Sequence, residues 1–176
     1  LTVGITATVW PVIRPRTPAL ALWLLALAGV NLALQAVENG HWLSMLSLSR
    51  SYAEAGAGDA GIYRSLGIVV RSAWRWAHYS HILVVVGWLF VLFGVLYRSA
   101  LVPRALAAFG LLTTLLHTAG ITWPVFLDYR MPSPELFGMP LGLAILIMAA
   151  WLIAKGFQEP QGASPAGARA VAAPGG

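Results

Sequence analysis

The chain has 176 residues, of which 59% are hydrophobic and only 10% are charged, and its formal net charge is +5. Soluble domains carry about 25% charged residues, so this composition excludes an ordinary soluble protein and indicates an integral membrane protein. The basic residues are scattered singly, without the patch by which nucleic-acid-binding proteins grip phosphates. We therefore expect the lipid bilayer, and no nucleic acid, as the partner. Cysteine is absent, which excludes disulfides and thiolate metal sites.

Long apolar runs predict an all-α fold, a polytopic transmembrane bundle of four full spans and one N-terminal partial span, because crossing the hydrocarbon core takes about 20 apolar residues. The opening run LTVGITATVWPVI is too short to cross, and we expect the chain to be truncated at its N-terminus. The run after the turn RPRTP is long enough to tilt or protrude. The predicted spans cover residues 1–13 (partial), 18–46, 74–97, 103–127 and 136–156.

Two further segments are predicted outside the spans. Residues 61–73 place apolar side chains at helical spacing with arginines between them, which predicts an amphipathic helix lying at the membrane interface. Residues 158–176 are rich in glycine, alanine and proline, which predicts a disordered tail. The helical bundle therefore occupies residues 1–157.

The basic residues of the short turns predict the orientation. One side of the predicted bundle carries basic residues in short turns and in the tail: Arg14, Arg16, Arg98, Arg104, Lys155 and Arg169. On the other side, acidic residues accompany the arginines. Because basic residues accumulate in cytoplasmic loops, we expect the first side and the C-terminus to be cytoplasmic. A bacterial inner membrane is the expected location.

Polar residues interrupt the apolar run of residues 18–46 in a regular pattern. Asn31, Gln35 and Glu38 follow one another at positions i, i+4 and i+7, which predicts a polar stripe along one helical face. The stripe ends in the stretch AVENGHW, where a carboxylate and an imidazole lie close together. We expect this stretch to lie near the extracytoplasmic side.

All four histidines are predicted in that same half of the bundle. Glu38 and His41 form an E-x-x-H pair and His78 and His81 an H-x-x-H pair, and residues three apart share a helical face. Such pairs on facing helices hold iron or manganese, and imidazole with carboxylate also suits zinc or copper. The candidate metal ligands are Glu38, His41, His78, His81 and His117, with haem as another possible cofactor. If His81 and His117 share an ion, their rings lie within roughly 5 Å.

Each part of this pattern also has a structural explanation. The polar end of the 18–46 helix can simply mark its arrival at water, and the paired histidines can belong to an aromatic interface belt. His117 lies inside an apolar span, where an ionisable group suggests function, yet a neutral imidazole can also bond across helices to a threonine or to Gln35. No G-x-S-x-G elbow, Walker loop or dinucleotide fingerprint occurs, so the sequence offers no sign of enzymatic activity.

The segments LYRSALVPRALAAFGLL and PLGLAILIMAAWLIAKGF resemble a bacterial family of multi-pass membrane proteins, the domain of unknown function number forty-three eighty-six. The resemblance covers about residues 18–157 and is strongest from Tyr97 onward. It implies a six-helix protein, of which this chain lacks the first helix and most of the second, with a cytoplasmic C-terminus. It carries over no catalytic residue, and the histidines are not part of its pattern. The signature residues resemble topological markers: Arg98, Pro103, Arg104, Trp151 and Lys155.

Three functions fit these observations. The first is a structural, sensory or accessory membrane protein, in which the polar stripe is a packing network. The second is a metal- or haem-binding redox protein that uses the histidine and glutamate residues as ligands. The third is a small-solute or lipid-handling protein with a cavity open to the outer side.

Overall fold

The computed structural model describes residues 1–54, 60–126 and 134–158. They form five α-helices and one 3-10 helix: α1 (Thr2–Ile13), α2 (Pro18–Glu54), α3 (Ala60–Arg98), α4 (Arg104–Phe126), η2 (Pro134–Phe137) and α5 (Met139–Lys155). These described residues contain no strand, and the predicted all-α fold is confirmed.

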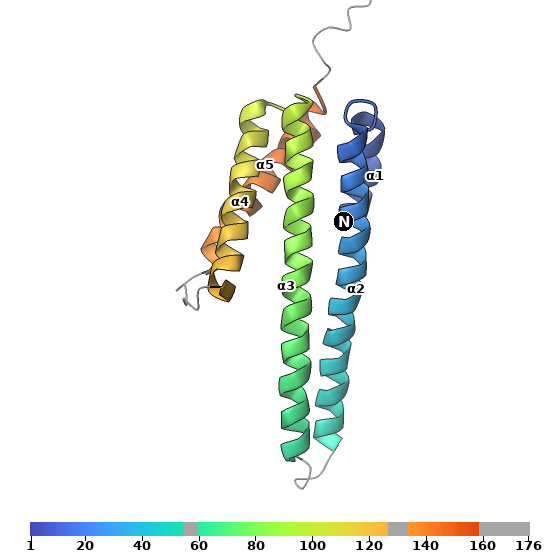
Figure 1. Ribbon diagram of the computed structural model, residues 1–176, viewed down its shortest axis with the longest axis vertical. Coiled ribbons are helices and arrows are strands. Elements are labelled where there is room, and N and C mark those ends of the chain that lie inside the picture. Colours follow the sequence, from blue (N-terminus) through green and yellow to red (C-terminus); the bar gives the residue numbers. More distant parts are fainter. Residues whose placement is uncertain (55–59, 127–133, 159–176) are drawn as a thin grey trace, which may run out of the picture.

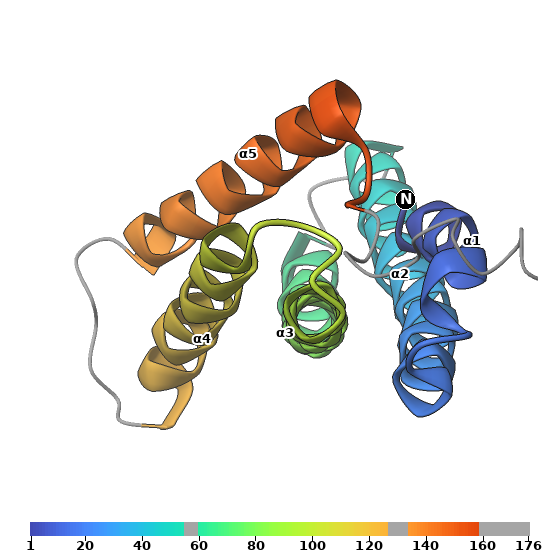
Figure 2. The same ribbon diagram turned by 90° about the horizontal axis from the view of Figure 1, so that it is seen from above.

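The two longest helices organise the molecule. α2 and α3 run antiparallel and side by side along its whole length, with α1 folded back on α2 and α4 beside α3 (Figure 1). Seen from above, α3 lies between α2 and α4, and α5 packs against α4 (Figure 2). All five α-helices are therefore present at one end, which we call the bundle end. At the other end α2 and α3 continue alone, and we call residues 42–54 and 60–77 the hairpin.

The core lies at the bundle end. Phe93 of α3 is only 1% exposed and lies against α4 at Gly110, where any side chain would overlap the phenyl ring. This close approach explains a glycine in the interior of α4, since small residues let membrane helices pack closely. On the opposite side of α3, the Trp88 indole N–H donates to the hydroxyl of Thr6 in α1 at 3.0 Å. α3 is thus the central helix of the bundle end.

Lipid is required to cover the outer surface. α2, α3 and α4 are long and apolar enough to cross a membrane, yet the most apolar 18-residue window of each is only 22%, 39% and 28% buried. Exposed side chains such as Leu22, Leu112 and Leu146 lie on this surface. Soluble proteins rarely expose apolar area on that scale. The chain is therefore a multi-pass membrane protein.

The last predicted span is shorter than expected. We predicted a helix over residues 136–156, but α5 has 17 residues and begins at Met139, after Gly138 and beside Pro140 near its start. The preceding turn is the 3-10 helix η2. Among the described residues, three helices have the length and composition expected of a span, and α1 and α5 are shorter apolar helices.

The predicted interfacial helix is also not separate. Residues 61–73 and 74–97 belong to one uninterrupted helix, α3, and α2 likewise continues past residue 46 to Glu54. No proline breaks either helix after Pro18, and each continues because it still has the other as a packing partner. The predicted disordered tail lies outside the described residues except for Gln158, whose backbone N–H donates to the carbonyl of Leu101 at 2.8 Å.

Candidate functional site

The contacts between α2 and α3 beyond the bundle end recur along one face of each helix. Three pairings mark this seam. Along each helix, the residues that form these pairings are spaced as expected for residues on a single helical face. The pairings are Glu38 with His78 and His81, Trp42 with Trp74, and Tyr52 with Tyr63.

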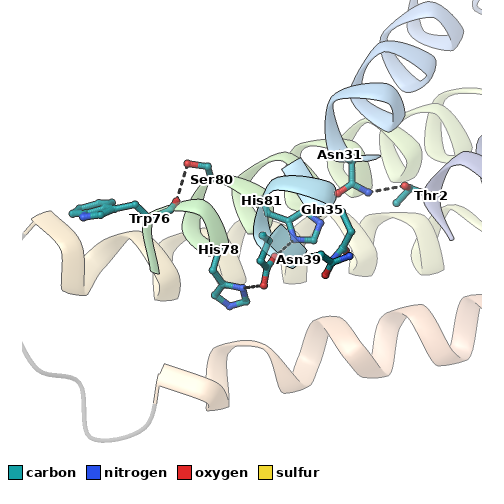
Figure 3. A network of polar contacts seen from close by, with 9 residues as sticks. Thr2, Asn31, Gln35, Asn39, Trp76, His78, Ser80 and His81 are labelled. Atoms are coloured by element: carbon teal, nitrogen blue, oxygen red, sulfur yellow. Dashed lines mark hydrogen bonds and ion pairs between the residues drawn. The ribbon is translucent and has the colours of Figure 1, made fainter. Parts of the chain in front are cut away.

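Glu38 is a buried carboxylate in the seam. Its Oε1 lies 2.8 Å from Nδ1 of His78 and its Oε2 lies 2.7 Å from Nδ1 of His81, so each imidazole donates an N–H to a different carboxylate oxygen. Figure 3 shows both rings turned toward this carboxylate. The side chain of Glu38 is 9% exposed and that of His81 13%, whereas His78 is 41% exposed. We call these three residues the carboxylate–imidazole cluster.

Two tryptophans cover the cluster on the hairpin side. The ring of Trp74 stacks on His78 with centroids 5.3 Å apart, and Trp42 meets Trp74 edge to face at the same centroid distance. Trp74, His78 and His81 lie on one face of α3 because they are four and three residues apart. The Trp74 ring therefore lies against one face of the His78 imidazole.

The charge of the cluster depends on the two imidazoles. Both rings use Nδ1 for the carboxylate, so an added proton goes to Nε2. With both rings neutral the cluster carries the single negative charge of Glu38; one added proton makes it neutral overall, and a second makes it positive. Charge-assisted hydrogen bonds are about twice as strong as neutral ones, and more so away from water. A proton added to either imidazole would therefore make its hydrogen bond to Glu38 a charge-assisted one.

The other residues of the predicted stripe have different surroundings. Asn31 is buried and donates to the hydroxyl of Thr2 in α1 at 2.6 Å, with its own carbonyl oxygen left unpaired. Gln35 is exposed and bonds to Asn39 at 3.3 Å on the same helix (Figure 3). The stripe is therefore divided: Asn31 links α2 to α1, Glu38 links α2 to α3, and Gln35 faces outward.

Two of the five candidate ligands lie outside the cluster. His41 is half-buried on α2, and His117 on α4 has a buried Nδ1 without a hydrogen-bond partner. Thr118, next to His117, lines a groove between α3 and α4 together with Leu83 and Val86. Within the described ranges, no group of three or more histidine or acidic side chains is arranged to hold a metal ion. The metal centre and the haem site remain predictions.

Some contacts of the site were not foreseen from the sequence. The contact of Trp42 with Trp74 and the bonds of Thr2 and Thr6 to α2 and α3 do not follow from the sequence pattern. A signal was present for the tryptophans, since Trp42 and Trp74 each lie four residues from a member of the cluster. No comparable signal marks the threonines.

The comparisons with known proteins agree with this description of the chain. The family described as "Domain of unknown function (DUF4386)" matches residues 1–156, which is most of the chain and includes the whole carboxylate–imidazole cluster. No curated protein and no solved structure matches it.

Proposed function

The chain belongs to this family of unknown function, and we propose that it is a sensory membrane protein in which the carboxylate–imidazole cluster makes the packing of the hairpin depend on proton concentration. This proposal rests on one observation: a buried carboxylate accepts hydrogen bonds from two imidazoles of the neighbouring helix. Histidine is the side chain whose charge ordinarily changes between about pH 5 and 8. The proposed location is the bacterial inner membrane with a cytoplasmic C-terminus, which the basic turns support.

The position of the cluster supports a role in transmitting a change of its protonation to the hairpin. It lies where the seam leaves the bundle end, so the hairpin beyond it is held by α2 and α3 alone (Figure 1). When one imidazole gains a proton, its hydrogen bond to Glu38 becomes an ion pair, and attraction between opposite charges is stronger in surroundings of low dielectric constant. We expect the first added proton to tighten the seam and narrow the range of hairpin conformations.

Other charged groups near the cluster must be distinguished from it. On α2 the next basic side chain is His41, three residues after Glu38, and on α3 it is Arg75, three residues before His78. α4, which packs on α3, contributes His117. None of these three is hydrogen-bonded to the carboxylate among the described contacts.

The proposal is tested by measuring the separation of α2 and α3 in the hairpin. Because the chain has no cysteine, spin labels can be placed at Ser47→Cys and Ser65→Cys, both exposed positions. In the protein reconstituted in lipid, electron–electron distance measurements should give a narrower distribution at about pH 6 than at about pH 8, because histidine titrates in this range. Glu38→Gln should abolish the narrowing.

The matched control is His41→Gln, which removes an imidazole from the same helix outside the cluster. In this variant the distance distribution should still become narrower at the lower pH, as it does with the unmodified cluster. The proposal is wrong if the distribution is independent of pH in the labelled protein, or if Glu38→Gln responds to pH as the unmodified cluster does.

A further inference from the structure

A groove with a volume of about 410 Å³ lies between α2 and α3 in the hairpin, beyond the carboxylate–imidazole cluster. α2 contributes Met45, Leu48 and Tyr52 to its lining. These residues follow one another at intervals of three and four, so they lie along one helical face. The groove is separate from the cluster, none of whose three residues lines it.

A glycine in α3 leaves space in the groove. A Cβ placed at Gly67 would lie 3.9 Å from Cδ2 of Leu48, so a longer side chain at this position would project into the lining. Toward the end of the hairpin, Tyr52 and Tyr63 meet edge to face with centroids 6.1 Å apart and contribute to the lining. The result is a largely apolar surface that an acyl chain or a glycerol backbone can contact.

Two arginines give the groove a positive edge. Arg64 and Arg71 both line it, and they lie on the same face of α3 because they are seven residues apart. Neither forms a salt bridge with an acidic side chain of the described residues. The whole hairpin contains four arginines, with Glu54 as its acidic residue among those described.

The length of the helices places the groove near lipid head groups. α3 has 39 residues and is about 58 Å long at 1.5 Å per residue, whereas a bilayer with its head groups is about 40–45 Å thick. With the bundle end in the hydrocarbon core, the hairpin extends through the head-group region and past it. Exposed Leu46, Leu66 and Trp76 on the hairpin favour this position, since they gain apolar contact there.

We propose that this groove binds an anionic phospholipid. Its phosphate is held by the guanidinium groups of Arg64 and Arg71, whose planar geometry suits phosphate oxygens. Its glycerol and the beginning of its acyl chains lie against Met45 and Leu48, in the space left by Gly67. The combination of positive edge and apolar lining selects this ligand over a soluble anion, which would leave the apolar surface uncovered. This inference goes beyond the proposed function, because it does not require proton sensing.

The test is native mass spectrometry of the full chain in detergent, with phosphatidylglycerol or phosphatidylcholine of identical acyl chains added. The protein should retain phosphatidylglycerol preferentially. The double variant Arg64→Gln/Arg71→Gln should lose roughly tenfold or more of that preference, as expected when two arginines near an anionic head group are removed. The matched control, Arg50→Gln/Arg75→Gln, removes the same charge from the hairpin outside the groove lining and should keep the preference.

A second pair of variants tests the apolar part. Gly67→Leu should fill the groove and reduce retention of phosphatidylglycerol, whereas Gly61→Leu adds the same side chain where nothing lies within 4 Å and should not. Replacing glycine by leucine favours the helix, and circular dichroism verifies that the variants remain folded. The proposal is overturned if the protein shows no head-group preference or if the two double arginine variants lose that preference equally. It is also overturned if the two leucine variants retain phosphatidylglycerol equally.

Discussion

The bundle end and the hairpin hold α3 against its neighbours by different means. At the bundle end α3 is surrounded by neighbours, and contact depends on shape: Phe93 fills the space that Gly110 leaves on α4. In the hairpin α2 and α3 pack mainly on each other. Their seam consists of the carboxylate–imidazole cluster, which precedes the hairpin, and two pairs of aromatic rings within it. Apolar packing suffices where several helices enclose a core, whereas two isolated helices need polar and aromatic pairs to define their register.

The largest effect is expected from removing Phe93, the largest of the side chains that are less than 2% exposed. Phe93→Ala should lower the free energy of unfolding by about 3 kcal/mol, because it leaves a cavity among rigid neighbours. The measurement is denaturant-induced unfolding in micelles followed by circular dichroism. Phe90→Ala is the control, since Phe90 on the same helix is 43% exposed, and it should cost much less. Equal losses would contradict the assignment of the core to the bundle end.

A smaller effect is expected from adding one methyl group between α3 and α4. Gly110→Ala should destabilise by about 1–3 kcal/mol, because the methyl group overlaps the Phe93 ring and forces the helices apart. Gly94→Ala is the matched control, since nothing lies within 4 Å of a Cβ at that position. The control should be neutral or slightly stabilising in the same unfolding assay. If the two variants behave alike, close approach at Gly110 does not determine the packing.

The smallest effect is expected for the polar link between α1 and α3. Trp88→Phe removes the hydrogen bond to Thr6, and the coupling energy between the two residues should be about 0.6 kcal/mol, the average for such bonds between membrane helices. The Thr6 hydroxyl keeps its bond to the Thr2 carbonyl, so no buried donor is left unpaired. A double-mutant cycle with Thr6→Val isolates the coupling energy. The hairpin distances between labels at positions 47 and 65 should not change; a change would show that the two ends are not independent.

Much of the architecture could be predicted from hydrophobic runs alone, because lipid requires long apolar helices. The extension of α3 through residues 61–73 could not. Its arginines suit an interfacial helix and a two-helix seam equally well, and only the presence of α2 alongside distinguishes the two. A periodic pattern shows which residues share a face, but it does not show which neighbour that face meets.

The same limit applies to the candidate site. The predicted depth in the membrane led to a comparison of the histidines with Glu38, but depth does not fix the rotation of a helix about its axis. Gln35 is only one turn from Glu38, yet it faces outward. His117 lies on α4, on the other side of α3 from α2 (Figure 2). Rotation depends on packing across the whole helix surface, which short polar motifs do not encode.

The bond from Gln158 to Leu101 makes membrane topology accessible to a simple experiment. It places the end of the α5 segment against the turn between α3 and α4, and Gly156, with φ of 67°, directs the chain there. A reporter enzyme joined directly after Gln158 would therefore lie on the same side as that turn. One fusion protein would thus give the side of both segments, and the antiparallel order of α2 and α3 would then assign the opposite side to the hairpin.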